Sequence, residues 1–182
     1  MPTYQNLVGI FHILWVAFVS SYGITTQLIR PLFDVTMFDS WYMAYTTFLF
    51  LSWTFLNGEC LISYVYKKIH EPDYIAGTQT MEFGDVTSVV SQDTLQNILL
   101  LSIVLHLGSV FLVLRRCGFS PSVYLSYILL VLGYLITLRI TLWFHPDALN
   151  DQVPFLLIQE WCKFGLILLV GWMVMTKRKE FA

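Results

Sequence analysis

The chain has 182 residues, of which 57% are hydrophobic and 12% are charged, and its formal net charge is −2. Soluble domains carry about 25% charged residues, so this chain has too little polar surface to coat a soluble globule of its size. The composition excludes a disordered chain, a collagen and a secreted disulfide scaffold, and the slightly negative charge gives no basic field for nucleic acid. What remains is a polytopic membrane protein.

Five stretches of the chain are long and apolar enough to cross a bilayer as helices. The hydrocarbon core is about 30 Å thick and needs about 20 apolar residues per helix. Basic residues end the first two stretches, and Ser120-Pro121 begins the fourth with an N-cap and a proline in the first turn. The predicted spans are residues 7–29, 41–66, 95–114, 121–144 and 154–176. We therefore expect an all-α, polytopic transmembrane bundle of five spanning helices that forms a single domain.

Lysine and arginine residues outside the spans indicate the orientation, because cytoplasmic loops carry an excess of them. Five spans place successive loops on alternate sides of the membrane. One side then collects six basic residues, namely Arg30, Arg115, Arg116, Lys177, Arg178 and Lys179, and the other side collects Lys67 and Lys68. This distribution predicts an N-terminus outside and a C-terminus in the cytoplasm.

Four charged residues fall inside the predicted spans, where each costs about 2.5–3.5 kcal/mol on insertion scales. They are Glu59, Arg139, Glu160 and Lys163. The predicted topology puts all four in the outer half of the bilayer, and their charges sum to zero. Glu160 and Lys163 share a helical face and are expected to pair, which leaves Glu59 to meet Arg139. This polar cluster is either an ion-pair network that fixes the helices or a cavity for a charged ligand or ion.

Two histidines also lie within spans, His12 in the first and His106 in the third. A haem with two imidazole ligands needs histidines at matching depth on facing helices, so these two are the candidate haem contacts. Hydrogen bonding to a neighbouring helix is the commoner arrangement for such a histidine. No other cofactor is expected, and no residue spacing indicates a metal site. The three cysteines, Cys60, Cys117 and Cys162, form no C-x-x-C pair, which argues against thiol–disulfide exchange.

The connector between the second and third spans, residues 67–94, is long for a loop. Pro72, Gly77 and Gly84 argue against one continuous helix through it. We expect residues 71–93 of this connector to be a recognition surface outside the bilayer that adds little to the stability of the bundle.

Two segments in the first half of the chain carry a sequence pattern that resembles a known protein family. The first is F-H-I-L-W-V-A-F-V at residues 11–19, and the second is N-G-E-C-L-I-S at residues 57–63, with matches as far as Gly77. The pattern resembles an uncharacterised family of small bacterial polytopic membrane proteins, which has a histidine-led first helix and a Cys-Pro-Leu-Thr turn. This chain lacks the proline of that turn. The family has no assigned activity, so the resemblance draws attention to the histidine, the glutamate and the cysteine but implies no function.

Three functions are compatible with these features. A non-catalytic subunit or structural component of a larger membrane assembly needs only packing faces and a contact surface, and it fits the absence of a catalytic motif. A small oligomeric carrier or channel would use the polar cluster. A haem- or quinone-linked redox protein would use His12 and His106. The first is the leading hypothesis. Its expected partners are the lipid bilayer and either copies of this chain or other membrane subunits, with no nucleic acid.

Overall fold

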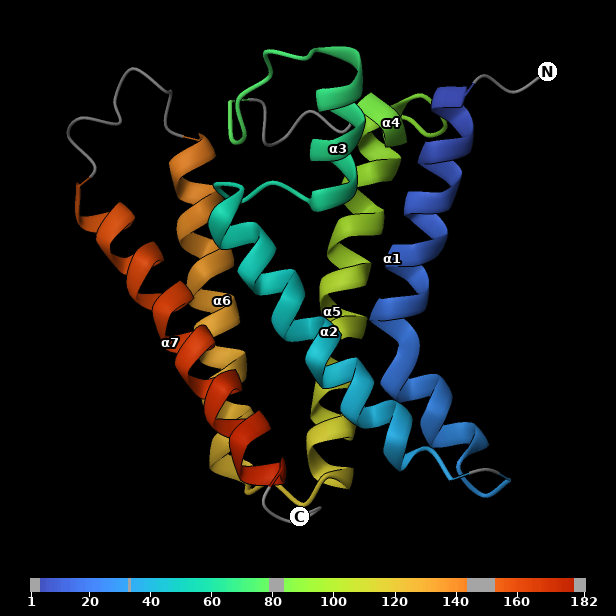
Figure 1. Ribbon diagram of the computed structural model, residues 1–182, viewed down its shortest axis with the longest axis vertical. Helices are drawn as coiled ribbons and strands as arrows, with labels where there is room; N and C mark the ends of the chain where they lie inside the picture. The colour runs from blue at the N-terminus through green and yellow to red at the C-terminus, as the bar shows by residue number, and fades with distance from the viewer. Residues whose placement is uncertain (1–3, 33, 79–83, 144–152, 179–182) are drawn as a thin grey trace.

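The structure is a computed structural model that describes residues 4–32, 34–78, 84–143 and 153–178, and these residues form helices without any strand. The helices are α1 (Tyr4–Ile29), α2 (Thr36–Phe55), α3 (Leu61–His70), α4 (Gly84–Thr87), α5 (Gln92–Arg116), α6 (Pro121–Trp143) and α7 (Val153–Arg178). The five long helices run between the two ends of the molecule in alternating directions, whereas α3 and α4 lie at the end where α1 begins (Figure 1). The all-α prediction is confirmed.

The long helices pack around a shared apolar core. Helix α1 packs along α5, α6 packs along α7, and α2 crosses the bundle to contact α7 and α5. Each long helix contributes buried side chains, among them Val19, Phe50, Val113, Tyr127 and Val170. The close contact between α1 and α5 depends on Gly23, because a Cβ atom there would overlap the backbone of Ser109. The Ser109 hydroxyl donates a hydrogen bond to the carbonyl oxygen of Ser20 over 2.6 Å, which adds a polar link to this contact.

Local sequence signals set the ends of α5 and the start of α6. The Ser91 hydroxyl accepts a hydrogen bond from the backbone N–H of Thr94 and caps the first turn of α5. Beyond the end of α5 the chain turns at Gly118, whose φ of 74° is a left-handed conformation that glycine adopts without strain. Pro121 then begins α6, since its fixed φ suits the first turn of a helix. These signals produce the tight turn between the two helices.

The second predicted span, residues 41–66, is wrong in its boundaries and in its continuity. Helix α2 begins earlier, at Thr36, and ends at Phe55, and the last part of the predicted span belongs to the separate helix α3. Asn57 and Gly58 break the helix because both have positive φ angles, of 52° and 86°. Asparagine and glycine adopt this left-handed conformation most readily, so the chain turns here although its apolar character continues. Glu59 follows the turn instead of lying inside a long helix.

The connector after α2 is structured, contrary to the expectation that it adds little to the bundle. Its first residues extend α3 as far as His70, and the side chains of Tyr74 and Asp85 are buried, with exposed fractions of 6% and 0%. Helix α4 packs against α1 so closely that a Cβ atom on Gly9 would overlap the Asp85 backbone. We call residues 59–78 together with α4 the cap.

Two of the described helices, α1 and α5, are long and apolar enough to cross a membrane, judged by length and composition, and the apolar stretch Pro121–Thr137 of α6 is shorter. Large apolar side chains are exposed on all of the long helices, for example at Leu14, Phe55, Leu100, Leu129 and Trp161. Several charged side chains are buried instead, which is the reverse of the usual distribution in a soluble protein.

Candidate functional site

Helix α3 turns its polar face toward the interior of the cap. Ser63 and Lys67, one turn apart, are buried, whereas Val65 and Ile69 on another face are exposed. A surface helix of a soluble protein has the opposite arrangement, with its apolar stripe inward. The inward polar face therefore needs polar partners, and the neighbouring residues of the cap and of α1 supply them.

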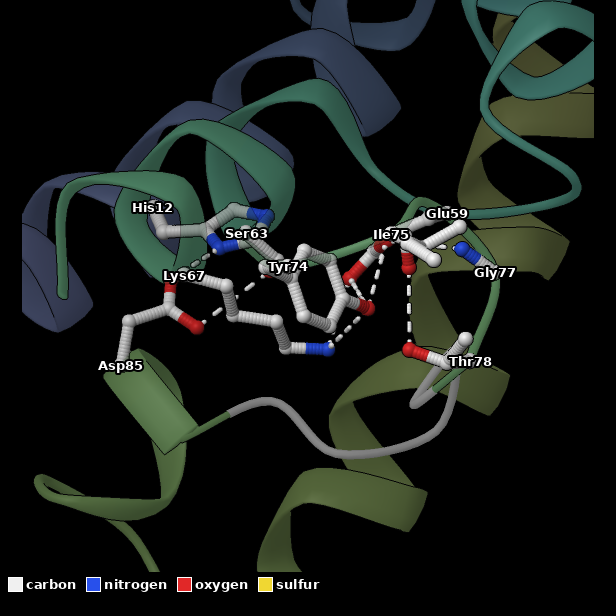
Figure 2. A network of polar contacts seen from close by, with 9 residues as sticks. All are labelled: His12, Glu59, Ser63, Lys67, Tyr74, Ile75, Gly77, Thr78 and Asp85. Atoms are coloured by element: carbon white, nitrogen blue, oxygen red, sulfur yellow. Dashed lines mark hydrogen bonds and ion pairs between the residues drawn. The ribbon is translucent and has the colours of Figure 1, made fainter. Parts of the chain in front are cut away.

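Glu59 is the centre of one half of this polar arrangement (Figure 2). Its carboxylate is fully buried and accepts hydrogen bonds from three donors, which are Lys67 Nζ at 2.6 Å, the Tyr74 hydroxyl at 2.9 Å and the Gly77 N–H at 3.3 Å. The Lys67 ammonium also lies 5.2 Å from the centre of the Tyr74 ring. We call these four residues the Glu59 network. It ties residues before, within and after α3 to a single carboxylate.

Cys60, the next residue, belongs to a second group that includes His12 of α1 and Asp85 of α4. His12 Nδ1 donates a hydrogen bond to Asp85 Oδ2 over 2.7 Å, and Cys60 Sγ lies 3.3 Å from Nε2 on the opposite side of the ring. The Ser63 hydroxyl donates to the other carboxylate oxygen of Asp85 over 3.3 Å. Figure 2 shows this carboxylate between its two donors. Asp85 and His12 are buried and Cys60 is half-buried. We call Cys60, His12 and Asp85 the thiol triad.

The surroundings of the thiol triad shift the pKa values of its two acidic groups. Burial raises the pKa of the Cys60 thiol, but the contacts with His12 and with the backbone N–H groups of Ile62 and Ser63 outweigh burial and bring this pKa below the ordinary thiol value. Cys60 is the N-cap residue of α3, where the helix dipole favours a negative charge. Burial also raises the pKa of Asp85, and its hydrogen bond with His12 outweighs that effect, so this pKa is lowered as well.

The thiol triad contains a nucleophile, a base in contact with it and a carboxylate that orients the base. Thiol- and serine-dependent acyl-transfer sites on unrelated folds share this relationship. Because Nδ1 of His12 is held by Asp85, Nε2 is the ring nitrogen that faces the Cys60 thiol. Among the described residues, no group of three histidine, cysteine, aspartate or glutamate side chains is placed to hold a metal ion.

The described residues of the predicted polar cluster do not all contact one another, and they form ion pairs in two separate places. Glu59 pairs with Lys67, a residue predicted to lie in a loop. The side chain of Arg139 lies outside the described residues, so its pairing with Glu59 stays a prediction. Lys163 donates to Glu160 over 2.6 Å within α7, as their spacing predicts.

The two histidines considered as haem contacts do not face each other. His12 belongs to the thiol triad, and His106 lies between the hydroxyl groups of Tyr42 and Tyr127, each 3.2 Å from one of its ring nitrogens. Both nitrogens of both rings are thus engaged by side chains, and this arrangement does not fit a haem held between them. His106 instead joins α5 to α2 and α6, as expected for a histidine that links neighbouring helices.

A charged contact at the opposite end of the molecule joins three helices. Arg116, at the end of α5, forms two hydrogen bonds of 2.7 Å to the carboxylate of Asp39 in the first turn of α2. It also donates to the Thr26 hydroxyl and to the carbonyl oxygen of Gly23 in α1. A cavity of about 400 Å³ lies beside this contact, and its lining includes Arg30. Because several acceptors already hold the guanidinium, we interpret Arg116 as a clamp between helices.

Four residues of the Glu59 network and the thiol triad were not predicted as site residues from the sequence, namely Lys67, Tyr74, Gly77 and Asp85. All four lie in the connector, where polar residues and glycines are expected in any loop. The pattern shared with the bacterial family contains His12, Glu59 and Cys60 and was the available signal for this end of the molecule. It did not indicate the partner of His12, because Asp85 is 73 residues away in the chain.

No protein-family model, curated protein or solved structure matches this chain. The resemblance to the bacterial membrane family stays a prediction, and the function is inferred from the geometry.

Proposed function

We propose that the protein is a multi-pass integral membrane protein whose five long helices cross the bilayer, and that it acts as a component of a larger membrane assembly. The observation that carries this proposal is the distribution of side chains over the molecule. Large apolar side chains are exposed on α1, α2, α5, α6 and α7, and a bilayer would cover such a surface. A soluble protein would have to expose the same surface to water.

The buried charges support the membrane location. The side chains of Asp39 and Arg116 pair at one end, and those of Glu59 and Lys67 pair at the other. Each pair is neutral as a unit, which lowers the cost of keeping the charges away from water. The alternating directions of the long helices fit five crossings with the cap on one face of the membrane (Figure 1).

The outer surface of the cap supports a role in assembly. Val65, Ile69 and Ile75 are exposed, although the cap beneath them is held by the Glu59 network and the thiol triad. A rigid polar interior that presents apolar side chains outward is typical of a contact surface for another protein. We propose that a second membrane subunit packs against this apolar patch.

Purification in a mild detergent tests the assembly role. Val65→Ser combined with Ile69→Ser should weaken association with the partner subunit by about tenfold or more, since truncating a central contact residue costs on the order of 1–2 kcal/mol. The thermal stability of the isolated chain should not change, because both side chains are exposed. Affinity pull-down and size-exclusion chromatography measure the association.

The matched control is Leu100→Ser combined with Leu101→Ser, two exposed residues of α5 outside the cap. This control should retain the partner. A wild-type chain that runs as a lone monomer, or a cap variant that keeps the full complex, would contradict the assembly role. Release of the wild-type chain from membranes by alkaline carbonate would contradict the membrane location.

A further inference from the structure

The thiol triad brings together three residues from three separate elements. His12 lies in the third turn of α1, Cys60 is the N-cap residue of α3, and Asp85 belongs to α4. We propose that Cys60 is the nucleophile of an acyl-transfer site, with His12 as its base and Asp85 as the residue that positions His12. The substrate class is an activated acyl group, a carboxylic ester or a thioester. This inference goes beyond the assembly role and does not depend on it.

The burial of the three side chains matches the roles assigned to them. Asp85 is fully buried and His12 is nearly so, which keeps the base and its partner in one orientation. Cys60 is half-buried and is the most exposed of the three residues. A nucleophile must meet a substrate, whereas the residue that only orients the base has no need to do so.

A purely structural role would require only part of this arrangement. The hydrogen bond between His12 and Asp85 is enough to tether α4 to α1, and the Ser63 hydroxyl already satisfies the second carboxylate oxygen. The thiol contacts the opposite ring nitrogen and is not part of that tether. It does place a sulfur 3.3 Å from the nitrogen that can take its proton.

The start of α3 supplies a second requirement of acyl transfer. The first N–H groups of a helix have no acceptor within the helix, and α3 has ten residues, enough for a developed dipole. The N–H groups of Ile62 and Ser63 lie close enough to Cys60 to help lower the pKa of its thiol. The same groups can stabilise an oxyanion that forms on a carbonyl carbon bonded to Cys60 Sγ.

The proposed reaction balances without any oxidant or metal ion. The Cys60 thiol proton passes to His12 Nε2 while the sulfur attacks the acyl carbonyl carbon and forms a C–S bond. Collapse of the tetrahedral intermediate breaks the bond to the leaving group, which takes the proton from His12 and departs as an alcohol or a thiol. Water or another nucleophile, deprotonated by His12, then attacks the thioester. As the C–S bond breaks, the protonated His12 returns the proton to the sulfur of Cys60.

Disulfide chemistry fits this site less well than acyl transfer. All three cysteines of the chain are free, and Cys117 lines the cavity near Arg116 at the other end of the molecule. Thiol–disulfide exchange needs a resolving thiol that the triad does not contain. Acyl transfer needs only the nucleophile, the base and the positioning carboxylate that are present.

Acylation of the full chain in detergent micelles tests the inference. Replacing Cys117 and Cys162 by serine leaves Cys60 as the only thiol and does not alter the triad. Incubation with palmitoyl-coenzyme A should place a hydroxylamine-sensitive acyl group on Cys60, detected by mass spectrometry, and Cys60→Ser should abolish it. His12→Gln should slow acylation by about 100-fold, as expected for loss of a general base. Asp85→Asn should slow it as well and change its pH profile, because the neutral amide no longer stabilises the protonated His12 that forms during the attack.

Two matched variants separate this role from general effects. A chain that keeps only Cys162 tests a thiol outside the triad and should acylate at the slow rate of His12→Gln. Tyr74→Phe loosens the neighbouring Glu59 network but leaves the triad intact, and its acylation rate should equal that of the single-thiol parent. A parent rate no faster than that of the Cys162-only chain would overturn the inference.

Alkylation with iodoacetamide gives a second readout, measured at Cys60 of the single-thiol parent with His12 and Asp85 unchanged. Because the pKa of Cys60 is lowered, the thiolate should already form at a pH below the ordinary thiol value of about 8.5. The midpoint of the alkylation rate against pH should therefore lie below that of the Cys162-only chain. A midpoint at or above the ordinary value would overturn the inference even if the His12 and Asp85 variants failed to fold.

Discussion

The pair formed by Glu59 and Lys67 allows a specific prediction about charge inside the cap. The two side chains are 0% and 8% exposed, so the loss of either charge removes an opposite charge at 2.6 Å from the other in a low dielectric. We expect Glu59→Gln and Lys67→Met each to reduce the free energy of unfolding by about 3–5 kcal/mol. The double variant should recover part of the loss because no lone charge remains. Unfolding in detergent of the wild type, both single variants and the double variant measures this coupling.

Glu160 and Lys163 provide the matched control for that prediction. They have the same charges at the same distance of 2.6 Å, but the Glu160 side chain is 63% exposed. The exposed Glu160 carboxylate is not confined by packing and can turn away from Lys163, so the coupling of this pair should be smaller than that of Glu59 and Lys67. Additive losses at Glu59 and Lys67, or equal coupling in the two pairs, would show that burial does not set the strength of the pair in the cap.

Adjacent residues serve different purposes at the start of α3. Glu59 belongs to the Glu59 network and Cys60 to the thiol triad, although they are neighbours in the chain. The backbone of Cys60 is extended, with φ −69° and ψ 133°, and an extended backbone turns successive side chains in opposite directions. This conformation lets Glu59 point into the Glu59 network while Cys60 points toward His12.

At the scale of the elements, the contact between α1 and α5 depends on the absence of a side chain at Gly23. A Cβ atom there would overlap the carbonyl group and Cα of Ser109, which are backbone atoms and can move only with the helix. We expect Gly23→Ala to reduce the free energy of unfolding by about 1–3 kcal/mol, as overpacking does in other cores. The shift in melting temperature in detergent measures the effect.

Gly171 of α7 is the matched glycine, because a Cβ atom there would meet nothing within 4 Å. Gly171→Ala should be neutral or stabilising by up to about 1 kcal/mol, since alanine is the better helix former. Equal destabilisation by the two substitutions would mean that helix propensity, and not the approach of α1 to α5, explains the result at Gly23.

The sequence predicted correctly those features that depend on one helix alone. Apolar length and local signals such as Pro121 predicted α1, α5, α6 and α7 to within a few residues of their ends. The pairing of Glu160 with Lys163 needed only helical geometry. The prediction failed at Asn57-Gly58, because apolar character does not reveal a left-handed backbone turn.

The thiol triad could not be predicted in the same way, because its members meet only through the path of the connector. Asp85 reaches His12 because α4 packs on α1, where Gly9 permits a close approach. The Glu59 network is a separate set of contacts that holds an earlier part of the connector against α3 through Tyr74. No spacing within the chain encodes a contact that arises from three packed segments.

At the scale of the whole molecule, ionic contacts secure both ends of the bundle. The Glu59 network and the thiol triad hold the cap, and Arg116 joins α5 to α1 and α2 at the other end. Arg116 and Lys67 are both neutralised by buried carboxylates. They therefore contribute less to the charge that orients the chain in a membrane than a count of basic residues implies.

The remaining basic residues still favour the orientation with a cytoplasmic C-terminus. Lys68 is on the side of the cap, whereas Arg30, Arg115, Lys177 and Arg178 are on the other side in a chain with five crossings. Omitting the paired residues Arg116 and Lys67 leaves this asymmetry in place. We therefore predict that the cap faces outward and that the C-terminal residues face the cytoplasm.

Cysteine labelling of intact cells checks both the orientation and the number of crossings. In a background without native cysteines, Thr3→Cys and Thr78→Cys should react with a membrane-impermeant maleimide, whereas Glu180→Cys should react only after permeabilisation. Labelling at position 180 together with protection at positions 3 and 78 would reverse the orientation but keep an odd number of crossings. Labelling of both terminal positions from the same side would instead exclude five crossings, because an odd number must place the two ends on opposite faces.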